Sequence, residues 1–218
     1  MMFDFILRIF VAGLMGALIG LEREYRAKEA GYRTHFLVSM GSALLMIVSQ
    51  YGFDTLLGET GIGLDPSRIA AQVVTGIGFI GAGTIIINKQ IVRGLTTAAG
   101  VWVTSGIGLA IGAGMYVLGI CATFLVLAGL ELLRFLFGNV GLHSTYIELI
   151  VNSADSLDKL QRTFLERGFI IVSYRVDEKN YSGNTVYNVS MVLKAHESAV
   201  SPLELLTNLQ GVTLRLLE

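Results

Sequence analysis

The sequence predicts an α-helical transmembrane bundle of five spans followed by a small α+β, ferredoxin-like cytoplasmic domain. Two uncharged runs, residues 69–88 and 94–130, contain 20 and 37 residues, and about 20 apolar residues are enough to cross a bilayer. Residues 1–138 hold 22 of the 26 glycines and 17 charges, whereas residues 139–218 hold four glycines and 16 charges. We therefore expect two domains, with a boundary near residues 138–141.

The apolar segments give the expected limits of the spans. They cover residues 3–21, 35–57, 68–88, 95–111 and 115–137. The first segment begins with Asp4 rather than with a group of lysines and arginines, and no small-x-small site precedes Glu22, so we expect an uncleaved span rather than a signal peptide. Arg8 lies on this span and can either reach the interface or pair inside the bundle. We expect it to reach the interface.

Basic residues in the short loops predict the orientation, because such loops resist translocation. Lysines and arginines gather in the first loop, residues 22–34, and in the loop between the third and fourth spans. The loop at residues 58–67 has two acidic residues and no basic one. We therefore expect the N-terminus outside and the C-terminal domain in the cytoplasm. Neither part carries the basic field that would suit nucleic acid.

The third span combines a helix start with a glycine motif. Asp65 can accept hydrogen bonds from free N–H groups, and Pro66 fits the first helical position. Residues 76–81, Gly-Ile-Gly-Phe-Ile-Gly, match the dinucleotide fingerprint in letters, but no strand precedes them and the run is uncharged. We expect helix packing rather than a cofactor, since glycines let helices approach closely in lipid. Glycine pairs also occur at Gly16/Gly20 in the first span and Gly108/Gly112 in the fourth.

Polar side chains within the spans are the candidates for function. Gln72 lies one turn after Arg68, and hydroxyl residues punctuate the fourth span. A single threonine is expected to bond back to its own helix. Together with the charges near the cytoplasmic ends, however, these side chains indicate a polar pocket or a partner-facing surface. A path for Mg²⁺ would need a row of carboxylates, and no acidic residue lies between Glu22 and Glu131 at one face and Asp65 at the other.

The residue pattern does not indicate an enzyme, a metal site or a cofactor. We find no nucleophile, base and orienting group at meaningful spacing, and no His/Cys cluster for a catalytic metal. His35 is expected to be an interfacial or packed histidine rather than a ligand. Cys121, the single cysteine, lies in an apolar run and is expected to be a packed thiol.

The C-terminal part reads as strand, helix, strand, strand, helix, strand. The expected strands cover residues 146–152, 169–176, 187–195 and 212–216. Asp155 is expected to cap the first helix, Ser201 and Glu204 to form a capping box for the second, and residues 180–184 to form a hairpin turn. We expect a second copy or the membrane domain to cover the sheet edge or a helical face. The expected position for a ligand is residues 152–156, although a simple helix cap is favoured there.

Four blocks of residues stand out together and occur in a fixed order. They are Gly20-Leu21-Glu22-Arg23-Glu24, Ala30-Gly31-Tyr32-Arg33-Thr34-His35, the stretch from Arg68-Ile69-Ala70 to Gly81-Ala82-Gly83, and Val92-Arg93-Gly94-Leu95-Thr96-Thr97-Ala98-Ala99. These blocks resemble the membrane-domain signatures of the MgtC/SapB family, and the resemblance covers residues 8–130. The tail is similar to the ACT-like domain that some members carry.

This resemblance implies a bacterial inner-membrane protein associated with growth at low magnesium and, in pathogenic members, with survival inside host cells. Members are commonly viewed as regulators of other membrane machinery, and the shortage of intramembrane carboxylates agrees with that view. The polar residues in or beside the matched blocks form the expected functional polar cluster. They are Glu22, Arg33, Thr34, Asp65, Arg68, Gln72, Arg93, Thr96 and Thr97.

Two functional hypotheses follow from these observations. The preferred one is a non-enzymatic regulator whose glycine-rich bundle docks on another inner-membrane protein, while the tail senses a ligand or dimerises. Its expected surroundings are membrane lipid, that partner protein and a further copy of the chain in a homo-oligomer, with a dimer expected first. The alternative is a transporter or channel for Mg²⁺ or another small solute, with polar residues of the third and fourth spans lining its path.

Overall fold

The computed structural model describes residues 1–53, 65–88, 91–137, 142–181, 184–196, 201–207 and 211–217. The chain divides into two compact units. One comprises Met1–Ile87 and Val92–Leu132, and the other comprises Asn88–Ile91 and Leu133–Glu218. The boundary predicted at residues 138–141 lies outside the described residues.

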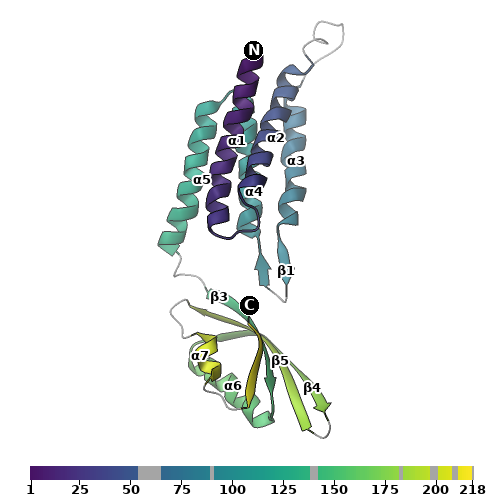
Figure 1. Ribbon diagram of the computed structural model, residues 1–218, viewed down its shortest axis with the longest axis vertical. Helices are drawn as coiled ribbons and strands as arrows, with labels where there is room; N and C mark the ends of the chain where they lie inside the picture. Colours follow the sequence, from purple (N-terminus) through teal and green to yellow (C-terminus); the bar gives the residue numbers. More distant parts are fainter. Residues whose placement is uncertain are drawn as a thin grey trace. The chain divides into compact units, whose positions relative to one another are not determined.

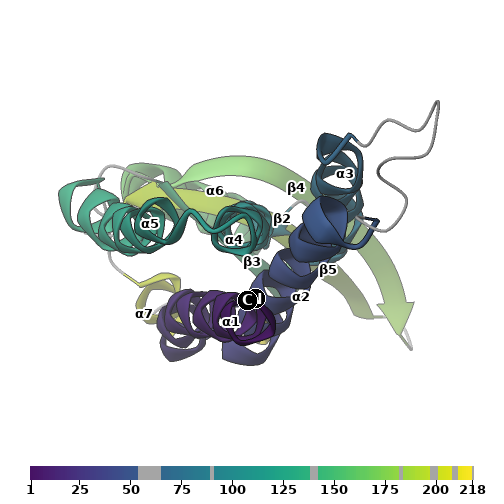
Figure 2. The same ribbon diagram turned by 90° about the horizontal axis from the view of Figure 1, so that it is seen from above.

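Five helices run side by side in the first unit (Figure 1). They are α1 (Met2–Tyr25), α2 (Tyr32–Tyr51), α3 (Ser67–Gly83), α4 (Leu95–Gly112) and α5 (Tyr116–Phe137). A hairpin of β1 (Ile86–Asn88) and β2 (Ile91–Arg93) joins α3 to α4 along the chain. Seen from above, α3 and α5 lie on opposite sides of α4 (Figure 2).

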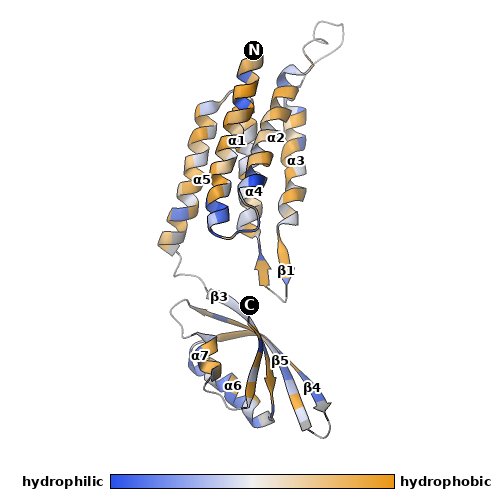
Figure 3. Ribbon diagram, in the orientation of Figure 1, coloured by the Kyte–Doolittle hydropathy of each residue, from blue (hydrophilic) through white to orange (hydrophobic). Residues whose placement is uncertain are grey.

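Apolar residues cover most of the length of these helices (Figure 3). In the described part of the chain, three stretches are long and apolar enough to cross a membrane, namely α1, α4 and Tyr116–Leu133 of α5. Helix α3 contains 17 residues, fewer than the about 20 that a span typically needs. The predicted second span runs to residue 57, and residues 54–57 are not described. The structure therefore supports a helical membrane part, while the predicted number of five spans is not confirmed.

Helix α2 packs between α1 and α4 through glycines, as predicted for two of the three glycine motifs. A Cβ atom on Gly16 of α1 would overlap the carbonyl oxygen of His35 in α2, and one on Gly108 of α4 would overlap that of Ser39. A Cβ atom on Gly112 would lie 2.6 Å from the carbonyl oxygen of Ala43. These backbones are closer than any larger residue permits, and such close approach is what holds helices together in lipid.

The glycine motif of α3 behaves differently. Cβ atoms built on Gly76 and Gly78 would meet no atom within 4 Å, and one on Gly81 would meet the carbonyl oxygen of Ala98 at 3.4 Å. The packing explanation is therefore wrong for Gly76 and Gly78 within one chain. The three-residue and five-residue spacing of these glycines does not by itself determine which side of a helix faces its neighbours.

The start of α3 agrees with its prediction in part, because Asp65 accepts from a free backbone N–H as expected, whereas Pro66 is the N-cap residue and Ser67 is the first helical residue. The Asp65 carboxylate accepts hydrogen bonds from the Ser67 backbone N–H at 3.0 Å and from the Ser67 hydroxyl at 2.6 Å. The hydroxyl and the N–H of Ser67 together hold the pKa of Asp65 below its usual value. An ion pair with Arg68 at 3.5 Å completes this exposed helix cap.

Two predictions about single side chains in the helices are wrong. Arg8 does not turn away to the interface, because Asp4 pairs with its guanidinium at 2.7 Å and the carbonyl oxygen of Gly112 accepts a hydrogen bond from it at 3.0 Å. Tyr116 donates to the same Asp4 at 3.0 Å, so α1, α4 and α5 are joined at this end. Cys121 is not packed but exposed on α5, since its run is apolar on all sides.

The second unit has the predicted order of elements. They are β3 (Leu142–Val151), α6 (Ala154–Glu166), β4 (Ile170–Tyr181), β5 (Asn184–His196), α7 (Pro202–Thr207) and β6 (Val212–Leu217). The strands form one antiparallel sheet in the order β4-β5-β3-β6. Ile147 and Leu149 of β3 pack against Leu160 and Phe164 of α6 in its core. This is the arrangement of a ferredoxin-like sandwich.

Details of the second unit correct the prediction in two places. Ser153 rather than Asp155 caps α6, because the Ser153 hydroxyl accepts from the Ser156 N–H at 3.2 Å while Asp155 lies within the first turn. This N–H is among those expected to receive a ligand. Strands β4 and β5 extend to Tyr181 and Asn184, so the hairpin turn is shorter than predicted, and its residues 182–183 are not described.

We predict that Gly108→Ala destabilises the helical unit by about 1–3 kcal/mol, the usual cost of forcing extra atoms into a packed contact. The matched control is Gly106→Ala on the same helix, since a Cβ atom there meets nothing within 4 Å. Denaturant unfolding of both variants in detergent micelles measures the difference. Equal stability of the two variants would contradict the packing described above.

Candidate functional site

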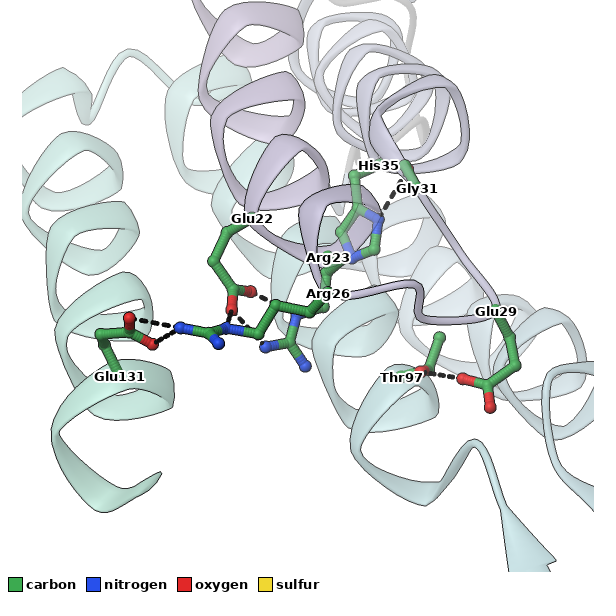
Figure 4. Close-up of polar contacts among 8 residues, drawn as sticks. All are labelled: Glu22, Arg23, Arg26, Glu29, Gly31, His35, Thr97 and Glu131. Carbon is green, nitrogen blue, oxygen red and sulfur yellow. Dashed lines mark hydrogen bonds and ion pairs between the residues drawn. The ribbon is translucent and has the colours of Figure 1, made fainter. Parts of the chain in front are cut away.

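A charged cluster of four residues, Glu22, Arg23, Arg26 and Glu131, lies where α1 ends (Figure 4). Arg23 is 4% exposed and donates to Glu22 at 2.8 Å, and Arg26 donates to the same carboxylate at 2.9 Å. Arg26 also donates to both carboxylate oxygens of Glu131 on α5. The cluster contains two positive and two negative groups, so its charges compensate one another while it ties α1 to α5.

A second contact fixes the segment between α1 and α2. The Thr97 hydroxyl, buried at the start of α4, donates to the Glu29 carboxylate at 2.6 Å (Figure 4). This hydrogen bond is the main cause that lowers the pKa of Glu29, with Lys28 and Arg93 contributing through their charge. This hydrogen bond therefore attaches the segment to α4 and favours the ionised form of Glu29.

His35 is fully buried at the start of α2. Its ring nitrogen Nδ1 lies 3.1 Å from the carbonyl oxygen of Gly31, one turn earlier (Figure 4). The prediction of a packed histidine is thus confirmed.

The nine residues predicted as a functional polar cluster do not form one group. Six of them lie at the end of the helices that holds the charged cluster, namely Glu22, Arg33, Thr34, Arg93, Thr96 and Thr97. Asp65 and Arg68 lie at the opposite end of α3, about 25 Å away for a helix of this length. Gln72 follows one turn later on α3. In the described part of the chain, Glu22 and Thr97 are the two of these nine residues that bond to a charged side chain at the first end.

The other predicted residues at the end that holds the charged cluster make few contacts. Arg33 donates to the neighbouring Tyr32 hydroxyl at 3.2 Å and is otherwise exposed. Arg93 and Thr96 are exposed, and Thr34 is half-buried. Their functional roles stay predictions, because the contacts within one chain do not indicate a role for any of them.

Sequence reasoning missed Glu29 altogether. It counted Arg23 and Glu131 among the charges that indicate a polar pocket or a partner-facing surface, without placing them in the expected cluster, and it used Arg26 only as an orientation signal. The signal for Glu29 was present, since it is an acidic residue within a basic loop, directly before the Ala30-Gly31 block. Nothing in the sequence, however, shows which hydroxyl of α4 it meets.

A cavity of about 600 Å³ lies between α2 and α3. Gly41 and Ser42 of α2 and Gln72 and Gly76 of α3 line it, and the other lining residues are apolar. Ser42 is also hydrogen-bonded to Ser105 of α4 at 3.0 Å. The cavity therefore combines an apolar wall with two polar side chains, one of which, Gln72, was predicted.

Metal ligands are not grouped in the described part of the chain. Among those residues, no three His, Cys, Asp or Glu side chains lie close enough together to hold a metal ion.

Residues 9–138 match the MgtC family. The chain belongs to this family. It is similar to the putative magnesium transporter YhiD of Escherichia coli K12, with 42% identity over 212 residues, 96% of each chain. It is also similar to the protein MgtC of Salmonella typhimurium LT2, with 43% identity over 134 residues, 62% of this chain and 54% of the relative. No solved structure matches the chain significantly.

Membership of the MgtC family confirms the resemblance found in the four blocks. Together with the apolar helices it makes this chain a membrane protein. The family match ends at residue 138, whereas the similarity to YhiD includes the second unit as well. An uncharacterized protein of Haemophilus influenzae is 34% identical over 179 residues, 79% of this chain and 75% of the relative.

We predict that Thr97→Val raises the pKa of Glu29 towards its ordinary value, because the hydroxyl that stabilises the carboxylate is lost. Carbon-13 NMR titration of the Glu29 carboxylate measures this. A lowered pKa stabilises the fold above the ordinary glutamate pKa, and this contribution disappears as the pH falls through the lowered value. The neighbouring, exposed Thr96→Val is the control, and an equal shift in both variants would contradict the assignment.

We also predict that Arg26→Glu and Glu131→Arg each speed up hydrogen exchange in the last turns of α5, and that the double variant restores slow exchange in part. The reason is that the reversed pair rebuilds the attraction between α1 and α5, whereas the ion pair of Arg26 with Glu22 is lost. Hydrogen exchange followed by mass spectrometry measures all three. If the double variant exchanges as fast as the single ones, the two side chains are not coupled.

Proposed function

We propose that this MgtC family protein is a non-enzymatic regulator in the bacterial inner membrane. It acts on another membrane protein during adaptation to low magnesium or to intracellular growth. The observation that carries this proposal is the open glycine face of α3, formed by Gly76 and Gly83, which lie on one side of the helix about two turns apart; a Cβ atom at either position would meet nothing within 4 Å.

Glycine lowers the stability of a helix by about 1 kcal/mol relative to alanine. The presence of open glycines on one face of a helix therefore calls for an explanation. The glycines of α1 and α4 gain close contact with α2 in return. Gly76 and Gly83 of α3 gain no such contact among the described residues, and Phe79 on the same helix is 85% exposed. In lipid, a stripe of small residues next to a large apolar side chain suits the close approach of a helix from another protein.

The neighbouring cavity extends this docking surface. Gly41 of α2 and Gly76 of α3 both line it, and both are open to added atoms. An apolar helix from a partner fits a groove between two helices, where small residues allow depth and Gln72 offers one polar contact. The surface is therefore a groove with a mainly apolar wall.

The proposed arrangement in the membrane has five spans, with α2 and α3 as the second and third. The charged cluster, Lys28 and Arg33 are at one end of the helices, which the positive-inside rule assigns to the cytoplasm. The N-terminus then lies in the periplasm and the second unit in the cytoplasm. A short third span is compatible with a tilted or locally thinned bilayer.

The second unit is proposed to be an ACT-like regulatory module. Its β-α-β-β-α-β order and its sheet order support this assignment. A small sheet with open edges gains stability by pairing, so a homo-oligomer, with a dimer expected first, accompanies the proposal.

The second candidate function is a transporter or channel for Mg²⁺ or another small solute. Two observations favour it: the name of the YhiD relative, putative magnesium transporter, and a cavity that contains Gln72. The cavity's wall is mainly apolar and its residues include no acid, whereas Mg²⁺ prefers carboxylate and water oxygens. We therefore rank this function second.

Site-specific photocrosslinking in native membranes tests the regulator. A photoreactive phenylalanine analogue at Phe79 is expected to capture a distinct membrane protein, and the same analogue at Phe124, 59% exposed on α5, is the matched control. Adding Gly76→Leu should abolish capture at position 79, because the side chain fills the face, while Gly106→Leu should leave it intact. Capture of this protein alone at position 79 would argue against the regulator.

Reconstitution into liposomes without a partner separates the two functions. A regulator is expected to move no Mg²⁺ under an imposed gradient. If the purified protein does move Mg²⁺, and Gln72→Ala or Asp65→Asn abolishes the flux, the transporter replaces our proposal.

A further inference from the structure

Three buried side chains between α2 and α4 have a polar atom with no hydrogen-bond partner in the described part of the chain. These atoms are Nε2 of His35, Oγ of Ser39 and Oγ1 of Thr104. All three residues are completely buried. Polar atoms left alone in an apolar interior are costly, so a group of three calls for a ligand that satisfies them.

The three residues lie along the same contact between α2 and α4. His35 and Ser39 are one turn apart on α2, and Gly100, Thr104 and Gly108 follow at the same spacing on α4. A Cβ atom on Gly100 would lie 3.6 Å from His35 Nε2, and one on Gly108 would overlap the carbonyl oxygen of Ser39. Thr104 therefore faces α2 between these two contacts, at the level of His35 and Ser39.

The chemistry of the group points to a neutral ligand. Nδ1 of His35 lies 3.1 Å from the carbonyl oxygen of Gly31, which can only accept, so Nδ1 carries the hydrogen and Nε2 of the neutral ring is an acceptor. The two hydroxyls can donate or accept. The nearest charged groups, Arg23 and Glu22 of α1, pair with each other.

We propose that His35, Ser39 and Thr104 form a buried water site between α2 and α4. Water donates and accepts, and a buried molecule typically makes about three hydrogen bonds. The missing side chain at Gly100 leaves space beside Nε2. This site makes His35 a proton acceptor in contact with water inside the helical unit, independently of the proposed function.

The water site lies one residue along α4 from a second polar contact. Ser105 directly follows Thr104, and it is hydrogen-bonded to Ser42, which lines the cavity between α2 and α3.

Solid-state NMR of the full-length protein in lipid nanodiscs, labelled with nitrogen-15 histidine, tests this proposal. We expect magnetisation transfer from water to His35 Nε2, in a signal assigned by its loss in His35→Gln. Gly100→Ala should weaken that transfer, because its methyl group occupies the space beside Nε2 at an ordinary contact distance.

Gly106→Ala on the same helix is the control and should leave the transfer unchanged, since its side chain meets nothing within 4 Å. The absence of transfer in the unsubstituted protein overturns the proposal. Equal transfer in Gly100→Ala and Gly106→Ala also overturns it.

Discussion

The close approach of three helix backbones, α1 and α4 on either side of α2, is the contact on which the helical unit depends. In lipid no hydrophobic force drives helices together, so dispersion and short distances must supply the attraction. Glycines supply the distance: a Cβ atom on Gly16 or Gly108 would overlap a carbonyl oxygen of α2. These contacts fix the rotation of α2 about its own axis. The rotation in turn positions the polar residues on the inner side of α2.

The candidate sites follow from this fixed rotation. At the start of α2, the turn from α1 brings Glu29 to Thr97 and His35 under Gly31. Farther along, Ser39 faces α4, and Ser42 reaches both Ser105 and the cavity beside α3. The outer helix α3 is held by fewer backbone contacts, and its glycines are open. The same residue type thus allows close packing inside the bundle and leaves open, on its outside, the face that we propose for docking.

Much of this fold is readable in the sequence, because long uncharged runs, the cap at Asp65 and alternating strands each have a local cause. Long-range partners are not readable. The prediction that Arg8 reaches the membrane interface is wrong because the carbonyl oxygen of Gly112, 104 residues away, accepts a hydrogen bond from its guanidinium. Glycines recur along α3 as they do along α1, yet only the assembled bundle shows which of them have a neighbour. Among the candidate residues, Thr97 has a partner, Glu29, that no local pattern reveals.

Helix α5 joins the two units along the chain, and it is attached in a different way from the inner helices. Its most apolar stretch is only 11% buried, and polar links to Asp4 and Arg26 hold its two ends. The attachment of α5 therefore depends on a few side chains, and a substitution at either polar link would affect α5 without touching the glycine contacts of α2.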